Sequence, residues 1–202
     1  MPLILTIILP LLAMISLFTL LHFYKKKENF NMDIEAINYV KSIENERLYK
    51  LFKIATTIGD PTSIVIMTIV VSFICYKNNY FKESIFFLIN IIGVWLFNEL
   101  LKLIYRRERP SIKLLKVRGY SLPSGHAMVF MAYSIIGIYL IFDKIGVNLI
   151  TCIITGIIVI LNIGVGLSRV YFRVHYLSDV IAGWYAGIVW ICLSIPIYRF
   201  YY

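Results

Sequence analysis

Three polar residues lie in a short link between two long apolar runs near the C-terminal end of the chain. They are Arg169, His175 and Asp179, spaced Arg-x5-His-x3-Asp. If the link turns into helix near His175, the four-residue spacing puts the imidazole and the carboxylate on one helix face. A carboxylate there can hold the ring in one tautomer and stabilise its cationic form, as a basic or nucleophilic histidine requires. The planar guanidinium of Arg169 suits an oxyanion such as phosphate.

A second motif, Pro123-Ser124-Gly125-His126, comes directly before another apolar run. Ser124 is a good helix N-cap and Gly125 permits close backbone approach, so the motif predicts the start of a helix. Free amides and the positive end of the helix dipole favour an anion at that point. The alternative is an ordinary cap followed by an interfacial histidine. That alternative is weakened because the chain has only three histidines, and this motif and the link hold two of them.

A third pair of cations is Lys102 and Arg109, with Arg109 followed by Pro110. They are seven residues apart, about two helical turns, so both could point the same way if helix continues to the residue before Pro110. Taken alone, a Lys or Arg at the end of an apolar span is usually an interfacial anchor. This pair therefore gains meaning only in combination with the other two motifs.

The composition places these motifs in a membrane protein. Of 202 residues, 60% are hydrophobic and 15% are charged, and the mean hydropathy of +0.80 is far too high for a soluble domain of this size. The formal charge of +9 could suggest a nucleic acid. The basic residues lie between apolar runs, however, so we expect anionic lipid headgroups and the bilayer as partners, with no nucleic acid and no obligate protein partner.

Six apolar runs are predicted to cross the bilayer. They are residues 2–24, 61–76, 84–105, 126–142, 148–167 and 181–197. The first lacks a basic leader and a small-residue cleavage site, which favours a retained span over a cleaved signal peptide. The expected fold is all-α, a six-transmembrane-helix bundle with an amphipathic interfacial helix after the first span, forming one domain over residues 1–202.

The amphipathic helix is expected over residues 33–57, where Leu48, Leu51, Phe52 and Ala55 follow the spacing of one helix face. We interpret it as a connecting helix along the membrane surface; a lid or lipid gate is the alternative. The number of membrane crossings relates this helix to the motifs. The loop 106–122 and the link after the fifth run are separated by two crossings, so both lie on the same membrane face, which the amphipathic segment shares. Three polar regions can thus meet in one pocket.

Together the three motifs resemble the signature of the type 2 phosphatidic acid phosphatase superfamily. They match it in order and spacing as Lys102-x6-Arg109-Pro110, Pro123-Ser124-Gly125-His126 and Ser168-Arg169-x5-His175-x3-Asp179. So many fixed residues in one context are far more specific than any single motif. The resemblance covers the C-terminal half closely and the remaining chain loosely. The stretch Gly119-Tyr120-Ser121-Leu122-Pro123 resembles most the bacterial phosphatidylglycerophosphate phosphatase type.

The resemblance implies a role for each motif residue. His175 would be the nucleophile that becomes a phosphohistidine, and Asp179 would orient it. His126 would protonate the departing alcohol and then activate water. The phosphate oxygens would be held by Lys102, Arg109, Arg169, Ser124 and the amide of Gly125. Fixed cations and a helix N-terminus can stabilise phosphoryl transfer without a metal or other cofactor, and no carboxylate cluster near these motifs suggests a Mg²⁺ site.

The implied activity is hydrolysis of a lipid phosphate, either a monoester or a pyrophosphate. Phosphatidylglycerophosphate, phosphatidic acid and undecaprenyl phosphate or pyrophosphate all fit, and the motifs do not choose among them. Two alternatives stay open. One is a lipid transporter that binds headgroups without hydrolysis, and the other is an enzyme like the vanadium haloperoxidases, which resemble this superfamily but are soluble.

Orientation is the point on which two sequence rules disagree. The resemblance implies a bacterial plasma-membrane protein with its site on the extracytoplasmic face. However, 16 of the 20 Lys and Arg residues lie on the predicted motif face, and only Lys77, Lys82, Lys144 and Arg199 lie on the other. The positive-inside rule therefore favours a cytoplasmic site. Phosphate binding would use several of these cations, although not Lys25, Lys26 and Lys27. On the resemblance we expect the extracytoplasmic face.

Overall fold

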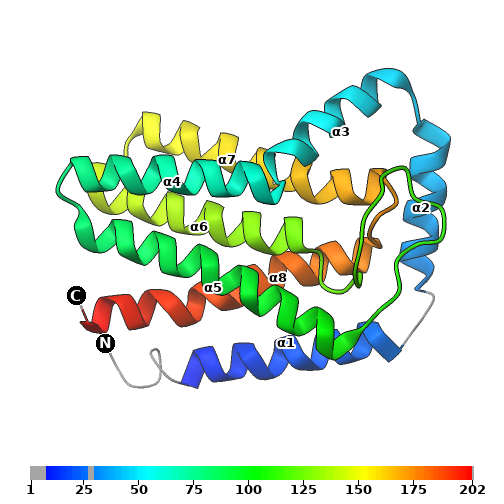
Figure 1. The fold of residues 1–202 in the computed structure, drawn as a ribbon, viewed down its shortest axis with the longest axis horizontal. Helices are drawn as coiled ribbons and strands as arrows, with labels where there is room; N and C mark the ends of the chain where they lie inside the picture. Colours follow the sequence, from blue (N-terminus) through cyan, green and yellow to red (C-terminus); the bar gives the residue numbers. More distant parts are fainter. Residues whose placement is uncertain (1–7, 27–29, 202) are drawn as a thin grey trace.

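The chain is all-helical in the computed structural model, which describes residues 8–26 and 30–201 (Figure 1). Within these ranges it forms no β-strand, so the predicted all-α class is confirmed. The helices are α1 (Leu9–Lys26), α2 (Asn31–Ile43), α3 (Glu46–Ile58), α4 (Pro61–Lys77), α5 (Phe81–Tyr105), α6 (Gly125–Ile145), α7 (Leu149–Tyr171) and α8 (Leu177–Tyr201).

Four of the described helices, α5 to α8, are each long and apolar enough to cross a membrane. Helices α3 and α4 pass that test only as a pair, bent by 51° at the break between them, which raises the number of candidate spans to five. Helix α1 is a shorter apolar helix, and residues 2–7 of the predicted first span lie outside the described residues. Large apolar side chains such as Ile69, Ile89 and Ile160 are exposed on the outer helix faces, as lipid contact requires.

The segment after α1 differs from the expected single amphipathic helix. It breaks at Glu44, whose extended backbone ends α2, and Asn45 begins α3 by accepting a hydrogen bond from the amide of Leu48. An asparagine that can cap a new helix competes with continuation of the old one, and periodicity alone does not detect this. The predicted apolar face is also only partly buried: Phe52 stacks on Tyr171, whereas Leu51 is 59% exposed.

Helices α6 and α8 pack closely because two glycines of α8 let the backbones approach each other. A Cβ added to Gly183 would lie 2.7 Å from the carbonyl oxygen of Ser124, and one added to Gly187 would lie 2.7 Å from that of Met128. This spacing of small residues is a common device for close helix packing in membranes. The crossing also brings the start of α6 beside the start of α8, where the Ser124 amide donates to the Asp179 carbonyl at 3.0 Å.

Three polar segments meet at one end of the bundle, as parity predicted: α2, the loop 106–124 and the link between α7 and α8 (Figure 1). The turn between α6 and α7 lies at the opposite end. One expectation about this end is wrong. Helix α5 stops at Tyr105, and Arg106 adopts a left-handed conformation with φ of 47°, so Arg109 lies in the loop and shares no helix with Lys102.

Candidate active site

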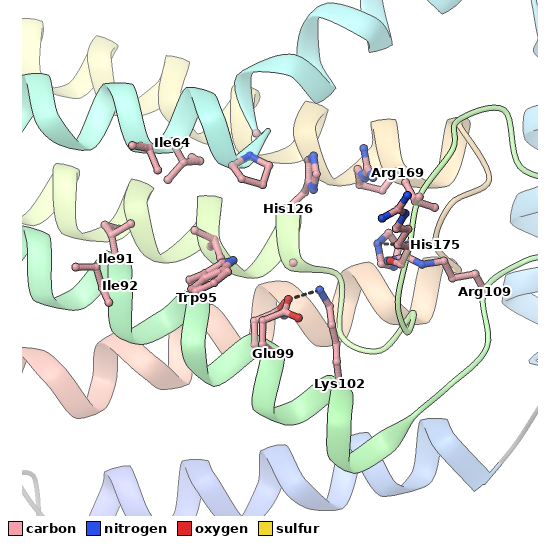
Figure 2. Close-up of a pocket in the computed structure, with 18 residues that line it drawn as sticks. Ile64, Ile91, Ile92, Trp95, Glu99, Lys102, Arg109, His126, Arg169 and His175 are labelled. Atoms are coloured by element: carbon pink, nitrogen blue, oxygen red, sulfur yellow. Dashed lines mark hydrogen bonds and ion pairs between the residues drawn. The ribbon is translucent and has the colours of Figure 1, made fainter.

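A cavity of about 460 Å³ lies between α4, α5, α6 and α7, beside the loop and the link (Figure 2). Six of the predicted site residues line it: Lys102, Arg109, Gly125, His126, Arg169 and His175. Ser124 and Asp179 are fully buried next to it and do not line it. The other end of the cavity is apolar, with Ile64, Ile91, Ile92 and Trp95 in its wall.

His175 lies in the link, two residues before α8 begins. The link turns sharply at Arg173, where φ is 53°, and the amides of Val174 and His175 donate back to the carbonyl of Arg169 at 3.1 and 3.3 Å. Helical geometry was expected to place the ring, and this expectation is wrong because His175 lies before the helix. The backbone of the turn and the neighbouring loop place it instead, and the ring is only 2% exposed.

The contacts of His175 assign its tautomer. Its Nε2 atom lies 2.9 Å from Nη1 of Arg109. Because a guanidinium only donates, Nε2 must accept and the proton must be on Nδ1. Nδ1 faces the oxygen of Ser121 at 3.4 Å and Oδ2 of Asp179 at 3.7 Å, and Ser121 in turn donates to Asp179. The connection from His175 to Asp179 thus runs partly through Ser121, a residue outside the predicted set of site residues.

Burial lowers the pKa of His175 from its ordinary 6.5 to about 3. The cause is the loss of water around a ring that would carry a charge if protonated, and Asp179 offsets only part of this effect. The ring is consequently neutral near pH 7. Its lone pair lies on Nε2, where it accepts from Arg109.

His126, at the start of α6, has a different carboxylate partner. Its Nε2 atom lies 2.8 Å from Oδ1 of Asp60, which precedes α4 at the bend after α3. Gly59 allows this approach, since a Cβ there would lie 3.3 Å from the His126 ring and 2.4 Å from Val165. The sequence analysis missed Asp60, because the two residues are 66 positions apart and no local spacing relates them.

The three predicted cations have partners of different kinds. Lys102 forms an ion pair with Glu99, one turn earlier on α5, at 2.7 Å (Figure 2). Arg169 donates from Nη1 to Thr56 of α3 at 2.5 Å. Arg109 acts as a clamp: its guanidinium reaches the carbonyls of Gly119, Val174 and Arg118 at 2.9, 2.8 and 3.2 Å, in addition to His175.

The N-terminus of α6 is closely built around Gly125. A Cβ at this position would lie 2.9 Å from Oδ1 of Asn98 and 3.4 Å from Nζ of Lys102, so a side chain would displace both. Two buried polar atoms in this region, Oγ of Ser124 and Nε of Arg169, have no hydrogen-bond partner within the described part of the chain. Buried donors normally have partners, and since Arg169 lines the cavity, an oxyanion there is an acceptor suited to its Nε–H.

Beneath these residues lies an ion cluster that sequence reasoning missed. Arg107 contacts both Asp179 and Asp33 of α2, and all three are buried. Asp33 is one of four acidic residues in the amphipathic segment, and nothing in its spacing relates it to the motifs. As for metals, no group of three or more His, Cys, Asp or Glu side chains in residues 8–26 and 30–201 could hold an ion.

A family model for the PAP2 superfamily matches residues 82–201, more than half of the chain. The chain therefore belongs to the PAP2 superfamily. The match contains all three motifs and the four helices around them, α5 to α8, and leaves out α1 to α4.

Individual relatives agree with this assignment. The chain is 34% identical over 99 residues to Phosphatidylglycerophosphatase B of Bacillus subtilis (strain 168), an alignment that covers 46% of this chain and 47% of that relative. The match thus spans about half the length of the relative.

Two solved structures have a similar fold. The first transmembrane PAP2 type phosphatidylglycerolphosphate phosphatase from Bacillus subtilis superposes with a TM-score of 0.79 at 22% identity, over 89% of this chain and 92% of that one. LpxE of Aquifex aeolicus superposes with a TM-score of 0.62 at 20% identity, over 84% and 97% of the two chains. At these identities the similarity establishes the fold, and it extends to the N-terminal helices that the family model does not cover.

Proposed function

We propose that this protein is a single-domain, integral membrane phosphatase that hydrolyses a lipid phosphate through a phosphohistidine, without a metal. One observation supports this most strongly. A single cavity combines two histidines and four cations, Lys102, Arg109, Arg118 and Arg169, at one end with an apolar wall at the other. A lipid phosphate has the same division between a charged headgroup and apolar tails.

The apolar end of the cavity suits entry from the bilayer. Val65, Ile92 and Trp95 line it and are 56%, 58% and 50% exposed on the outer faces of α4 and α5. Exposed apolar side chains on such helices face lipid tails. A substrate could place its acyl chains between α4 and α5 while its phosphate reaches Lys102 and Arg169.

In the first step, Nε2 of His175 attacks phosphorus and the bond from phosphorus to the lipid oxygen breaks. Arg109 moves its guanidinium from Nε2 to a phosphate oxygen, with Lys102 and Arg169 on the others. His126 gives a proton to the departing lipid oxygen, which leaves as an alcohol. The proton on Nδ1 of His175 faces Ser121 and Asp179, which stabilise the positive charge that develops on the ring.

In the second step, a water molecule loses a proton to His126 and attacks phosphorus. The bond from phosphorus to Nε2 breaks, inorganic phosphate leaves, and His175 returns to its neutral form. Asp60 accepts a hydrogen bond from Nε2 of His126, so the proton that moves in both steps is carried by Nδ1, and the carboxylate stabilises the doubly protonated ring that the first step needs. Each histidine thus has its own carboxylate.

Phosphatidylglycerophosphate is the first substrate to test, because the Bacillus relative is named for it and the Gly119–Pro123 stretch resembles that type. Phosphatidic acid and undecaprenyl phosphate or pyrophosphate complete the panel. The decisive measurement is phosphate release by purified protein in detergent, with EDTA present. Wild type should release phosphate from at least one lipid, and His175→Ala should release none.

The matched control is His22→Ala, since His22 is the third histidine and is exposed on α1. Its activity should equal that of wild type. Unchanged release by His175→Ala would refute the phosphohistidine mechanism. Headgroup binding without release by wild type would favour the transporter alternative.

We further propose six crossings, with α1 as the first and α3–α4 as a broken second span, and the site on the extracytoplasmic face of a bacterial plasma membrane. Reporter fusions after Lys144 and after Arg199 test this orientation. Both should report a cytoplasmic location; an external location for both would reverse it.

A further inference from the structure

A cluster of four buried residues lies behind the His175 link: Asp179, which the first step uses, and Arg107, Asp33 and Ser178, which have no part in the steps above. Its centre is Arg107, in the loop after α5. Nη1 of Arg107 donates to Oδ1 of Asp179 and to Oγ of Ser178, both at 2.7 Å, and Nη2 donates to Oδ2 of Asp33 at 2.9 Å. Neither Asp33 nor Arg107 is among the residues that line the cavity.

Asp33 of α2 also holds the first turn of α8. Its Oδ1 accepts from the amide of Ser178 at 2.8 Å, and its Oδ2 accepts from the Ser178 hydroxyl at 2.6 Å. The first amides of a helix have no partner within the helix, and a carboxylate there also interacts favourably with the helix dipole. Asp33 is therefore an N-terminal cap supplied to α8 by a helix about 145 residues earlier in the chain.

Arg107 acts on both oxygens of the Asp179 carboxylate, on one directly and on the other through Ser121. One oxygen is held directly by the guanidinium. The other accepts from the hydroxyl of Ser121 and from the amide of Tyr176 at 2.9 Å, and the Ser121 amide is in turn held by the carbonyl of Arg107 at 2.8 Å. The ring of Tyr176 packs on the Arg107 guanidinium, with 4.4 Å from Cζ to the ring centroid. This contact fixes the plane of the guanidinium.

A buried carboxylate with one oxygen unbound could rotate or move toward another donor. In this site such a rotation would withdraw the acceptor from Ser121 and Nδ1 of His175. Nε2 would then be aimed differently, and a misplacement of about 1 Å at a reacting atom can cost about 100-fold in rate.

We propose that Arg107 and Asp33 are positioning residues for the phosphoryl transfer: Arg107 fixes the Asp179 carboxylate that orients His175, and Asp33 fixes Arg107 and the start of α8. This inference rests on the proposed function for its kinetic test. It also gives the amphipathic segment a specific task, which is to deliver Asp33 beneath the site. Glu44 at the end of α2 reinforces the attachment through an ion pair of 2.8 Å with Arg173 of the link.

The experiment compares Arg107→Lys and Asp33→Asn with matched controls. Arg106→Lys is the control for the first, because Arg106 is the adjacent, exposed arginine, and Glu35→Gln is the control for the second, because Glu35 is exposed on the same helix. Lysine keeps the charge but cannot bind Asp33 and Asp179 as a fork. Both substitutions keep the approximate volume, so each protein can be checked for folding by its thermal unfolding midpoint.

Steady-state kinetics with the best lipid substrate should show kcat reduced by about 10- to 100-fold for Arg107→Lys and by about 3- to 30-fold for Asp33→Asn, with KM within about twofold. The two controls should match wild type. The double variant should lose less than the product of the single losses, because Asp33 acts through Arg107. A residue with only a structural role would lower the unfolding midpoint and the amount of folded enzyme, but would leave kcat per folded molecule unchanged.

Orthovanadate binding separates this inference from the proposed function. Vanadate can accept the Nε2 lone pair as a fifth ligand and so reports the aim of His175 without turnover. If wild type released no phosphate from any lipid, the proposed function would fail. The positioning role would still be supported by weaker vanadate binding in both variants than in both controls. Equal vanadate binding, unchanged kcat, or losses explained wholly by unfolding would each overturn it.

Discussion

The site contains two pairs of histidine and aspartate that differ in how the chain brings them together. His175 and Asp179 are four residues apart, and both are almost completely buried. His126 and Asp60 are 66 residues apart, and the Asp60 side chain is 43% exposed. The first pair is visible in the sequence as a spacing, whereas the second exists only because the α3–α4 bend packs against the start of α6.

The two pairs also differ in the distance between imidazole and carboxylate. The pair that is farther apart along the chain is the closer one in space. The distant pair is in direct contact at 2.8 Å, whereas the local pair is 3.7 Å apart and connected through Ser121. A short spacing therefore indicates that two groups can meet, but it does not establish that they do. The surrounding loop decides whether the contact is direct or relayed.

The difference in role between the two histidines gives the largest expected effect. His175→Ala should reduce phosphate release to background with every substrate, because no other described side chain in the cavity is proposed to bond to phosphorus. Radiolabelled lipid phosphate, quenched at alkaline pH where phosphohistidine survives, should label wild type and leave His175→Ala unlabelled. A labelled His175→Ala would assign the nucleophile elsewhere.

His126→Ala should lower turnover of lipid phosphates by about 100- to 10,000-fold, the usual contribution of a general acid. A substrate whose leaving group needs no protonation, such as a nitrophenyl phosphate ester, should restore formation of the phosphohistidine in this variant. The measurement is the burst of nitrophenol. His175→Ala should show no burst with the same ester, and a burst absent from both variants would remove the distinction between acid and nucleophile.

Replacing the carboxylates should separate the pairs further. Asp179→Asn should lower kcat by about 100-fold or more, since the buried carboxylate accepts hydrogen bonds that an amide cannot all accept, whereas Asp60→Asn should lower it by about 10-fold. Parallel measurement of kcat and the unfolding midpoint gives the comparison. A larger loss for Asp60→Asn would show that the pair found only in the structure is the more important one.

The smallest effect concerns stability and pH. Burial lowers the pKa of His175 to about 3, so the unfolded chain takes up a proton below pH 6.5 that the folded protein excludes. This contribution to the free energy of unfolding is present above pH 6.5 and is lost progressively as pH falls toward 3, by at most about 1.4 kcal/mol per pH unit. Denaturant titrations between pH 4 and 8 should show a shallower dependence for His175→Gln than for wild type. Equal slopes would mean that the ring is accessible to protons in the folded state.

Much of the molecule could be predicted from the amino-acid sequence. Apolar runs located the helices α4 to α8, because a helix in lipid must satisfy its own backbone and needs a continuous apolar exterior. The polar Asn162 inside α7 is satisfied by a neighbouring helix, since its amide donates to Ser134 of α6 at 3.0 Å. The motif residues were recognisable because phosphoryl transfer requires specific side chains at fixed positions.

Other features required the three-dimensional structure. The break at Asn45, the end of α5 at Tyr105 and the clamp formed by Arg109 depend on capping and loop contacts that compete with simple periodicity. Asp33, Asp60 and Arg107 had no recognisable pattern, since each meets its partner across 60 or more residues.

The sequence by itself determined which side chains could perform the chemistry and which segments must be helical, because both follow from residue type and short-range spacing. Only the tertiary structure decided which acid serves which histidine, how Asp179 is held and what the amphipathic segment contributes. Those pairings arise where separate helices pack at one end of the bundle, and packing joins residues without regard to their distance along the chain.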